Sequence, residues 1–553
     1  MKENRRYPLI LLFACLCLFA FGLGNRDLWD PDEPRYAGIA RSILESGDWV
    51  ALRDNGRPYG DKPPLYFWIL AGASRLGSGM TPLASRVPST LFALLTVLLA
   101  YRLGKVMFGA RVGFLGGLVL TTTQRFFLEA RWVHIDMLLC LLVLVALYSA
   151  YRGLETKNGW WWVAGYSAMA AGCMAKGPVA VAIPFVALLI YLATSGQLDR
   201  MGESWWPAGI PAAVMPALAW LWIFSGRTGL HPLETLRTQV FERFREGIHH
   251  PRPSYYYLVS LPLEFLPWTP FLAGAMAVSI PLPGRADRKP LLFLYGWILG
   301  GIALLSLSAE KRPSYLLPLL PPLALLVAYF WDRYLVCWNA ESLRPWVEGP
   351  LLVYAAACPV AILFIGRQAS SYPGLEGRLI PLTLIYLATC VATLYATRNR
   401  KRGSAFLSLL GGLIVGYLWI AGTVLPWLNG YKSARPFCDR IVARIGRAPL
   451  SIYGDYHPAF SYYTHRRLEI IRSPGDLTAF LSTPEGGFCI VELRHFESLG
   501  ARLPIQELDR KAVGHRTYLL VSARPTSMPA TPQPANAPGD RGNALRTGFP
   551  SSL

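Results

Sequence analysis

The sequence predicts a polytopic α-helical membrane protein that ends in a small soluble α/β domain. Of its 553 residues, 53% are hydrophobic and only 16% are charged. Apolar runs close to the ~20 residues needed to cross a bilayer recur up to about residue 425. A soluble chain of this length would divide into several domains and would alternate polar and apolar residues more often.

The apolar runs give thirteen candidate spans, of which the third and the fifth are short. The opening MKENRR and the run after it look like a signal peptide, but no small-residue cleavage pattern follows. Because further spans follow as well, we interpret this run as a retained first helix. The predicted spans cover residues 8–24, 82–104, 112–124, 133–151, 160–175, 178–194, 205–225, 256–280, 291–308, 314–331, 350–366, 379–397 and 405–425.

The net charge of +20 is explained by cytoplasmic loops, which collect Lys and Arg. The basic cluster TRNRKRGS at Thr397–Ser404 is the strongest topological marker. It places the N-terminus inside, and the first loop (26–80) and the C-terminal region outside. No aromatic-basic motif for RNA or DNA is present, so we expect membrane lipids and no nucleic acid as partners.

Positive charge is also retained on the outer side, which the topology rule disfavours. The loop from Gly226 to Tyr255 holds five arginines and three histidines. An anionic ligand such as a phosphate accounts for this charge. The alternative is that these side chains reach lipid headgroups. The short outer connections add Arg125, Arg131, Lys176, Lys311 and Arg312.

The polar C-terminal region divides into a domain and a tail. Residues 429–523 are predicted to form a soluble α/β domain on the outer face, with an amphipathic helix at Ser433–Gly446 and strands in LSIYGDY, FCIVELR and TYLLVSA. The Pro- and Ala-rich residues 524–553 are predicted to be disordered. The sequence leaves undecided whether Cys438 and Cys489 form a disulfide in an oxidising compartment.

The first outer loop begins with a predicted interfacial helix. Its apolar residues repeat at helical spacing, and Pro34 and Gly47 suit its start and its end. Asp30, Asp32 and Glu33 crowd the start, where one acid would suffice as a cap. We therefore expect a functional carboxylate there, with simple N-capping as the alternative. The apolar stripe consists of Tyr36, Ile39, Ala40, Ile43 and Leu44.

Two further segments carry chemistry. In RPYGDKPP (residues 57–64) the paired prolines start an apolar run that is too short to span, so Tyr59 and Lys62 would lie at headgroup depth, suited to hold a phosphate. In RWVHIDMLL, Asp136 stands at the outer start of a span beside Arg131 and His134. A carboxylate entering the bilayer usually faces a polar cavity.

The segments DPDEPRYAGIARSILESGDWV and YGDKPPLYFW resemble the first outer loop of the GT-C glycosyltransferases that use lipid-linked sugars. MAKGPVA, FERFREGIHHPRPSYYY, LEFLPW and AEKRPSYLLPLLPP follow in the family order. The likeness is greatest to the bacterial aminoarabinose transferases that modify lipid A, and looser to the protein O-mannosyltransferases. It implies a GT-C fold of about thirteen transmembrane helices with interfacial helices.

The resemblance implies transfer of 4-amino-4-deoxy-L-arabinose from undecaprenyl phosphate to a lipid A phosphate. The site would face the periplasm from the bacterial inner membrane, and the product would confer resistance to polymyxin and cationic peptides. Asp32 and Asp136 match its acids, and Glu33 is a further catalytic candidate. The carrier phosphate is expected near Arg35, Tyr59, Lys62, Lys311 and Tyr315, with Arg131, Lys176 and Arg243 as further candidates from the outer-face charge.

The resemblance also implies a divalent metal site, of zinc for example, at His250 and residue 61. The family motif resembles Y-x-E-K-P, whereas this chain has Asp61 in place of Glu, a carboxylate one methylene shorter. No glycine-rich nucleotide motif is visible, so no nucleotide cofactor is expected. The alternatives are a GT-C enzyme that glycosylates protein or glycan, an inactive sugar-lipid binder, and a lipid-linked sugar transporter. No inverted repeat supports the transporter.

Overall fold

The computed structural model describes residues 5–77, 79–247, 251–336, 340–368, 372–483, 486–500 and 503–524. The chain divides into two compact units, Met1–Ser433 and Ala434–Leu553. The predicted border at residue 428/429 is therefore five residues early. The reason is local: Asn429 and Ser433 both donate hydrogen bonds to the Asp27 carboxylate, at 3.0 and 2.7 Å, which ties this segment to the first unit.

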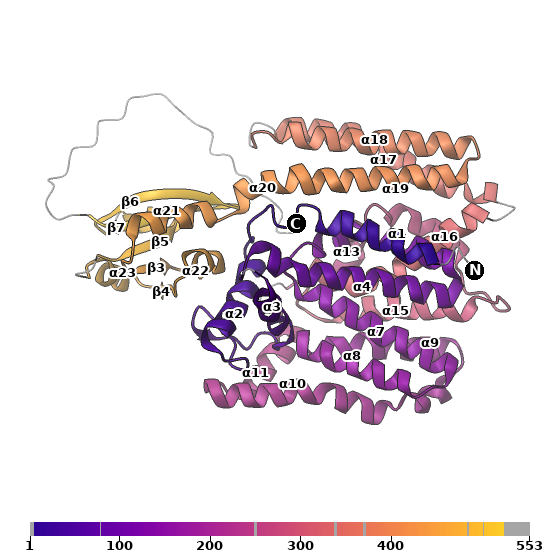
Figure 1. Ribbon diagram of the computed structural model, residues 1–553, viewed down its shortest axis with the longest axis horizontal. Helices are drawn as coiled ribbons and strands as arrows, with labels where there is room; N and C mark the ends of the chain where they lie inside the picture. Colours follow the sequence, from indigo (N-terminus) through magenta and orange to yellow (C-terminus); the bar gives the residue numbers. More distant parts are fainter. Residues whose placement is uncertain are drawn as a thin grey trace. The chain divides into compact units, whose positions relative to one another are not determined.

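The first unit is almost entirely helical (Figure 1). Its α-helices are α1 Arg6–Cys15, α2 Asp32–Ser46, α3 Leu65–Leu76, α4 Pro82–Phe108, α5 Ala110–Thr121, α6 Gln124–Glu129, α7 Ile135–Thr156, α8 Trp160–Lys176, α9 Val179–Thr194, α10 Trp206–Thr228, α11 Pro232–Leu236, α12 Arg243–Arg245, α13 Tyr256–Glu264, α14 Leu272–Val278, α15 Arg288–Leu307, α16 Leu320–Val336, α17 Pro345–Gln368, α18 Glu376–Arg398, α19 Arg402–Trp419 and α20 Leu425–Lys432. The 3-10 and π segments are η2 Leu16–Ala20, η3 Leu198–Ser204, η4 Arg237–Glu242, η5 Thr269–Phe271, η6 Pro313–Leu319, η7 Ala340–Leu343 and η8 Ile420–Val424.

All thirteen predicted spans coincide with helices of this unit. In the described part of the chain, eight helices are long and apolar enough to cross a membrane, and a bent pair makes nine. The remaining four predicted spans are the shorter helices α1, α5, α8 and α9. The predicted span at residues 256–280 is present but sharply bent. Helix α13 and the η5–α14 segment meet there at 108°. Pro267 lies at this break, and its missing N–H cannot continue a helix.

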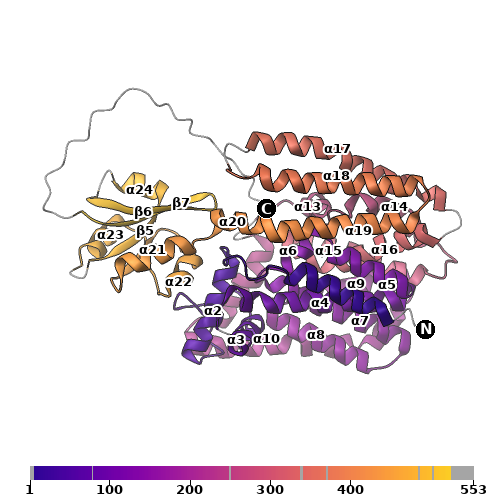
Figure 2. The same cartoon turned by 45° about the horizontal axis from the view of Figure 1, so that its top comes forward.

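The helices pack in a bundle with the interfacial elements at one end. In Figures 1 and 2, α2 and α3 lie beyond the ends of α4 and α7. Figure 2 shows α17, α18 and α19 side by side along another edge of the body. Charged residues at the ends of α6, α8 and η6 thereby come within reach of the first turn of α2, as their ion pairs show below.

Helix α2 confirms the predicted interfacial helix. It runs from Asp32 to Ser46, and Gly47 follows in the left-handed conformation at φ 70°, with its N–H donating to Ile43. Four of the five stripe residues are buried, and the Tyr36 ring packs edge-on against Phe67 of α3. Helix α3 has only 12 residues, which agrees with a segment that embeds without spanning.

A short hairpin that was not predicted joins α2 to α3. Strands β1 (Arg53–Asp54) and β2 (Arg57–Pro58) pair antiparallel around Asn55 and Gly56, which have φ values of 52° and 80°. Asn-Gly is the preferred pair for such a turn, so the signal was present in the sequence. The Tyr59 N–H donates to the Leu52 carbonyl at 2.8 Å, which extends the hairpin by one further hydrogen bond beyond its two strands.

The second unit confirms the α/β prediction and adds two strands. The predicted amphipathic helix is α21 (Arg435–Ile445), and the predicted strands are β3, β5 and β7. Strands β4 and β6 were not predicted. The elements after α21 are β3 Leu450–Tyr453, α22 Pro458–Thr464, β4 Glu469–Ile471, α23 Pro474–Leu481, β5 Phe488–Glu492, α24 Leu493–Gly500, β6 Ile505–Val513 and β7 Arg516–Ala523.

The sheet of this unit has the order β4-β3-β5-β7-β6. Strands β4, β3 and β5 are parallel, and β7 runs antiparallel to both β5 and β6. Cys438 and Cys489 do not form a disulfide, because they lie in two separate hydrophobic clusters. Along β5, Ile490 joins the first cluster and Cys489 the second, as expected for neighbours that point to opposite faces. The tail predicted to be disordered lies outside the described residues from 525 onward.

Candidate active site

The first turn of α2 places Asp32 among cations. Its Oδ2 lies 3.3 Å from Nη1 of Arg312 and 3.7 Å from Nε2 of His134. Burial by itself would raise the pKa of Asp32, but His134, Arg312 and Arg35 outweigh it and hold the pKa well below its usual range. Asp32 is therefore an ionised carboxylate in the site.

The second predicted acid, Asp136, comes to the same place from the first turn of α7. It is 3% exposed and forms an ion pair with Lys176, which ends α8. The Lys176 ammonium also lies 4.1 Å from the centre of the Tyr315 ring, at the start of η6. Three predicted residues from three distant segments thus meet, which the sequence order alone does not show.

His134 links the two acids. Its Nδ1 lies 3.1 Å from Oδ2 of Asp136 and 2.7 Å from Oε2 of Glu129, while Nε2 faces Asp32. Burial would lower the pKa of His134, but the charges of Glu129 and Asp136 raise it to about 10. The ring therefore carries a positive charge at neutral pH.

Lys62 is a half-buried lysine of the segment between the hairpin and α3. No described side chain forms a hydrogen bond or an ion pair with its ammonium group. Burial, followed by repulsion from Arg243 and Lys176, lowers the pKa of Lys62 to about 8. A half-buried ammonium of this kind can accept an anionic group.

Tyr59 and Arg35 lie on the α2 side of Lys62. Tyr59 is 9% exposed, and burial together with the charge of Asp61 raises its pKa well above the usual value, so its hydroxyl stays protonated and able to donate. Arg35 lies 3.4 Å from Asp54 of the hairpin. The unpredicted hairpin therefore positions one of the predicted arginines.

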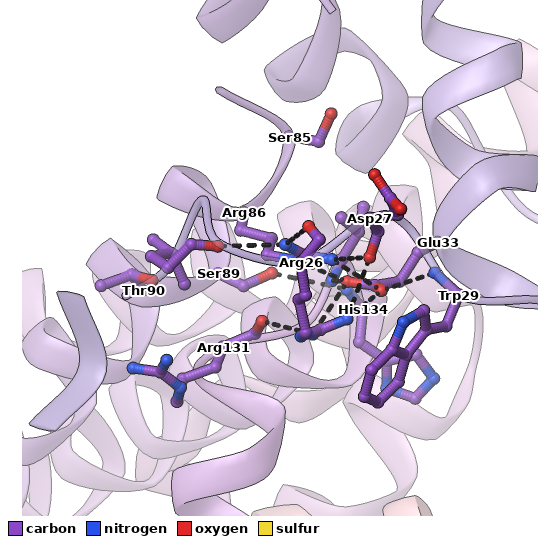
Figure 3. A network of polar contacts seen from close by, with 12 residues as sticks. Arg26, Asp27, Trp29, Glu33, Ser85, Arg86, Ser89, Thr90, Arg131 and His134 are labelled. Carbon is purple, nitrogen blue, oxygen red and sulfur yellow. Dashed lines mark hydrogen bonds and ion pairs between the residues drawn. The ribbon is translucent and has the colours of Figure 1, made fainter. Parts of the chain in front are cut away.

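Glu33 lies next to Asp32 in sequence but has a different environment (Figure 3). Glu33 as a whole residue is 5% exposed, and its carboxylate accepts hydrogen bonds from Arg26 at 2.6 Å and from Arg86 at 2.8 Å. The backbone N–H groups of Trp29 and Val133 donate to it as well, at 2.9 and 3.2 Å. Burial would raise the pKa of Glu33, but the two arginines lower it to about 2. Its contacts are those of a structural anchor.

Two predicted phosphate ligands point elsewhere. Arg131 donates to the carbonyls of Leu18 and Phe19 at 2.8 and 3.0 Å. Lys311 donates to the Arg252 carbonyl at 3.1 Å and to that of Ser308. The structure therefore does not bring these two cations into the cluster, because backbone acceptors hold them.

The predicted metal ligands are only partly described. Asp61 accepts a hydrogen bond from Gln239 at 3.0 Å and pairs with Arg243 at 3.2 Å, so both of its oxygens are engaged. His250 lies outside the described residues. Within the described ranges, no group of three His, Cys, Asp or Glu side chains is arranged to hold a metal ion. The zinc site stays a prediction, and Asp61 as placed here fits a salt bridge rather than a ligand.

Three residues that shape the site were not singled out from the sequence, and a fourth, Arg312, was named only as one of the outer-face cations. Glu129, 1% exposed, is the closest neighbour of His134, and Arg312 is the closest cation of Asp32. Arg26 and Arg86 anchor Glu33. Arg86 lies inside the long apolar helix α4, and a charge within a span is a signal for a buried partner that could have identified it.

Part of the described cluster falls within a region that matches a known family. Residues 61–223 match the family described as dolichyl-phosphate-mannose-protein mannosyltransferase. This region includes Asp61, Lys62, His134, Asp136 and Lys176.

Relatives and solved structures cover more of the chain. The undecaprenyl phosphate-alpha-4-amino-4-deoxy-L-arabinose arabinosyl transferase of Yersinia pestis (strain Pestoides F) is 29% identical over 434 residues, which are 76% of this chain and 77% of the relative. That of Yersinia enterocolitica is 28% identical over 437 residues, again 76% and 77% of the two chains. The crystal structure of ArnT from Cupriavidus metallidurans bound to undecaprenyl phosphate superposes with a TM-score of 0.77 at 20% identity, covering 93% of this chain and 97% of that one. This chain is thus a multi-pass membrane protein with the GT-C fold, similar over most of its length to the aminoarabinose transferases.

Proposed function

We propose that this protein is an integral-membrane glycosyltransferase that moves 4-amino-4-deoxy-L-arabinose from undecaprenyl phosphate to a lipid A phosphate on the periplasmic face of the inner membrane. The observation that carries the proposal is the half-buried ammonium of Lys62, which has no ion-pair partner among the described residues and lies near the Asp136 carboxylate, itself linked through His134 to Asp32. The relatives named for this sugar and this lipid carrier support the choice of substrate.

The positive charges of the site explain how the carrier phosphate can leave the sugar. When the bond from the sugar to the carrier phosphate breaks, negative charge develops on the phosphate oxygens. Among the described residues, Lys62 forms no ion pair with Asp61 or Asp136, whose charges act on it at longer range, so its ammonium can bind that phosphate. A preorganised cation in a partly buried site stabilises developing charge more strongly than it would in water.

The role of Asp32 in this proposal depends on whether a phosphate or a hydroxyl group accepts the sugar. A lipid A phosphate is already ionised at neutral pH and needs no strong base. Asp32 then orients the acceptor, holds the ammonium of the aminosugar, or stabilises positive charge on the sugar ring in the transition state. If the acceptor were a hydroxyl group, Asp32 would take its proton as a general base.

The second candidate is transfer of a sugar from a polyprenyl phosphate to a protein or glycan. The family match over residues 61–223, which carries the name of a protein mannosyltransferase, favours it. In this case the acceptor is a hydroxyl, and transfer should depend on deprotonation by Asp32.

Mass spectrometry of lipid A from a deletion strain and a complemented strain separates the two candidates. The first predicts that the aminoarabinose adduct disappears in the deletion strain and returns with the wild-type gene but not with an Asp32→Asn gene. Polymyxin resistance should follow the adduct. A lipid A spectrum that is the same in all strains, with a sugar lost from a protein or glycan, would establish the second candidate instead.

A further inference from the structure

His134 stands where carboxylates from three helices converge. Glu129 ends α6, Asp136 begins α7 and Asp32 begins α2, and one oxygen of each lies 2.7, 3.1 and 3.7 Å from a ring nitrogen of His134. Only 13% of the histidine side chain is exposed. Three carboxylates this close in a mostly buried place repel one another unless a cation separates them.

The two nitrogens of the ring face different partners. Nδ1 lies between Glu129 and Asp136, and Nε2 faces Asp32. Because Glu129 lies nearest to Nδ1, its charge favours the ring orientation in which Nε2 faces Asp32. Glu129 is in turn held by Arg125, at 3.3 Å, and Arg125 pairs with Glu264 of α13.

Other charged and titratable groups face this cluster from each neighbouring element. Lys176 of α8 pairs with Asp136, and Arg312 before η6 pairs with Asp32. Arg35 acts on Asp32 through its charge, and Lys62 acts on Asp136. Three tyrosines interact electrostatically with these charges: Tyr36, Tyr257 and Tyr315. His134 lies within ion-pair distance of both acids, Asp32 and Asp136.

We propose that His134 is a positioning residue whose imidazolium, oriented by Glu129, fixes the carboxylates of Asp32 and Asp136 relative to each other in the active site. This inference rests on the proposed transferase function. The charges of Glu129 and Asp136 keep the pKa of His134 near 10, so the ring is positive over the neutral range. His134 touches neither donor nor acceptor in this account, and it acts through the two acids.

The test compares His134→Gln, His134→Lys and Glu129→Gln with the wild-type protein in lipid nanodiscs. His515→Gln is the matched control, because His515 is an exposed histidine in the turn between β6 and β7 of the second unit. Transfer from undecaprenyl-phosphate aminoarabinose is measured against pH, and undecaprenyl phosphate binding is measured separately. His134→Gln should lower kcat on the order of 100-fold through misplacement of the acids, with binding of undecaprenyl phosphate unchanged.

The pH profile distinguishes positioning from mere structure. Without the imidazolium, Asp32 loses a cation that lowers its pKa, so the acid limb of His134→Gln should move to higher pH. Glu129→Gln keeps the ring but removes the charge that raises its pKa most, so its alkaline limb should move to lower pH. His134→Lys retains a cation and should recover part of kcat and most of the acid limb.

The inference is overturned if His134→Gln transfers with the wild-type kcat and pH profile. If that variant does not accumulate in the membrane, Glu129→Gln decides, and an unmoved alkaline limb contradicts the inference. A His134→Gln/Glu129→Gln double variant should lose less than the sum of the two single losses, and strict additivity would also count against it. Wild-type protein without transfer activity would instead reject the proposed function.

Discussion

Asp32 and Glu33 are neighbours in the first turn of α2, yet their carboxylates have different contacts and different exposure. Glu33 accepts hydrogen bonds from two arginines and two backbone N–H groups at 2.6–3.2 Å. Asp32 has cations at 3.3 and 3.7 Å, and its side chain is 20% exposed against 7% for Glu33. One carboxylate is saturated by the protein, and the other keeps acceptor capacity for a substrate.

A single helical turn therefore carries one carboxylate that stabilises the fold and one that faces the charged cluster. Successive helix residues point about 100° apart, so Glu33 enters the helical body while Asp32 faces the cluster. Because Glu33 is anchored, it fixes the backbone from which the Asp32 carboxylate projects. Residue type alone does not distinguish these roles, whereas the number of protein donors does.

The largest expected effect comes from breaking the anchor. Arg86→Met leaves the Glu33 carboxylate with one arginine in a buried place, which costs about 3–5 kcal/mol of stability. Thermal unfolding in detergent should show a large fall in Tm. Arg227→Ala, which removes an exposed pair with Asp48, is the control and should change stability by less than about 1 kcal/mol. Equal effects of the two changes would contradict the anchoring role.

The next effect is on donor binding. Lys62→Met removes the ammonium group and should weaken undecaprenyl phosphate binding about 10- to 100-fold, since a hydrogen bond to a charged group contributes about 1.5–3 kcal/mol. Isothermal titration or native mass spectrometry measures it. Lys105→Met, an exposed lysine of α4, is the control. Unchanged binding in Lys62→Met would remove Lys62 from the phosphate site.

Binding should also depend on pH through the same lysine. The pKa of Lys62 is lowered to about 8, so the free protein carries this charge at pH 7 and loses it as the pH rises through 8. Undecaprenyl phosphate affinity should therefore fall by up to about tenfold between pH 7 and pH 9. Lys62→Arg stays charged throughout and should show a flat profile. A wild-type profile equally flat would contradict the lowered pKa.

The smallest effect concerns the hairpin that carries Asp54 toward Arg35. Gly56→Ala places a side chain at φ 80° and should cost about 1–2 kcal/mol, because the left-handed conformation disfavours an L-residue. Gly411→Ala, in a helix with open space around it, is the control. Tm and transfer activity should both fall slightly in Gly56→Ala, and no change in either would show that this turn does not constrain the site.

The sequence predicted the helix that presents Asp32 because its signals are local. The spacing of Tyr36, Ile39 and Ile43 defines one face, and Gly47 ends the helix. The resemblance to a known family then made Asp136 and Lys62 candidate site residues, and the outer-face charge added Lys176; the structure brings these three close together.

The partners of these residues were not predictable in the same way. Glu129 meets His134 from another helix, and Arg86 meets Glu33 from a position 53 residues later. Such pairings depend on how whole helices pack, which no local pattern records. For the same reason Glu33 looked catalytic, and Arg131 and Lys311 looked like phosphate ligands, although protein groups already hold all three.

The most direct measurement compares Asp32→Asn with Glu33→Gln, recording Tm and aminoarabinose transfer for each purified variant. The account predicts that Asp32→Asn keeps its Tm and its undecaprenyl phosphate binding while transfer falls at least 100-fold. Glu33→Gln should lower Tm strongly, with its remaining folded fraction active. Near wild-type transfer by Asp32→Asn, or an equal loss of Tm in both variants, would contradict the division of roles between these neighbouring acids.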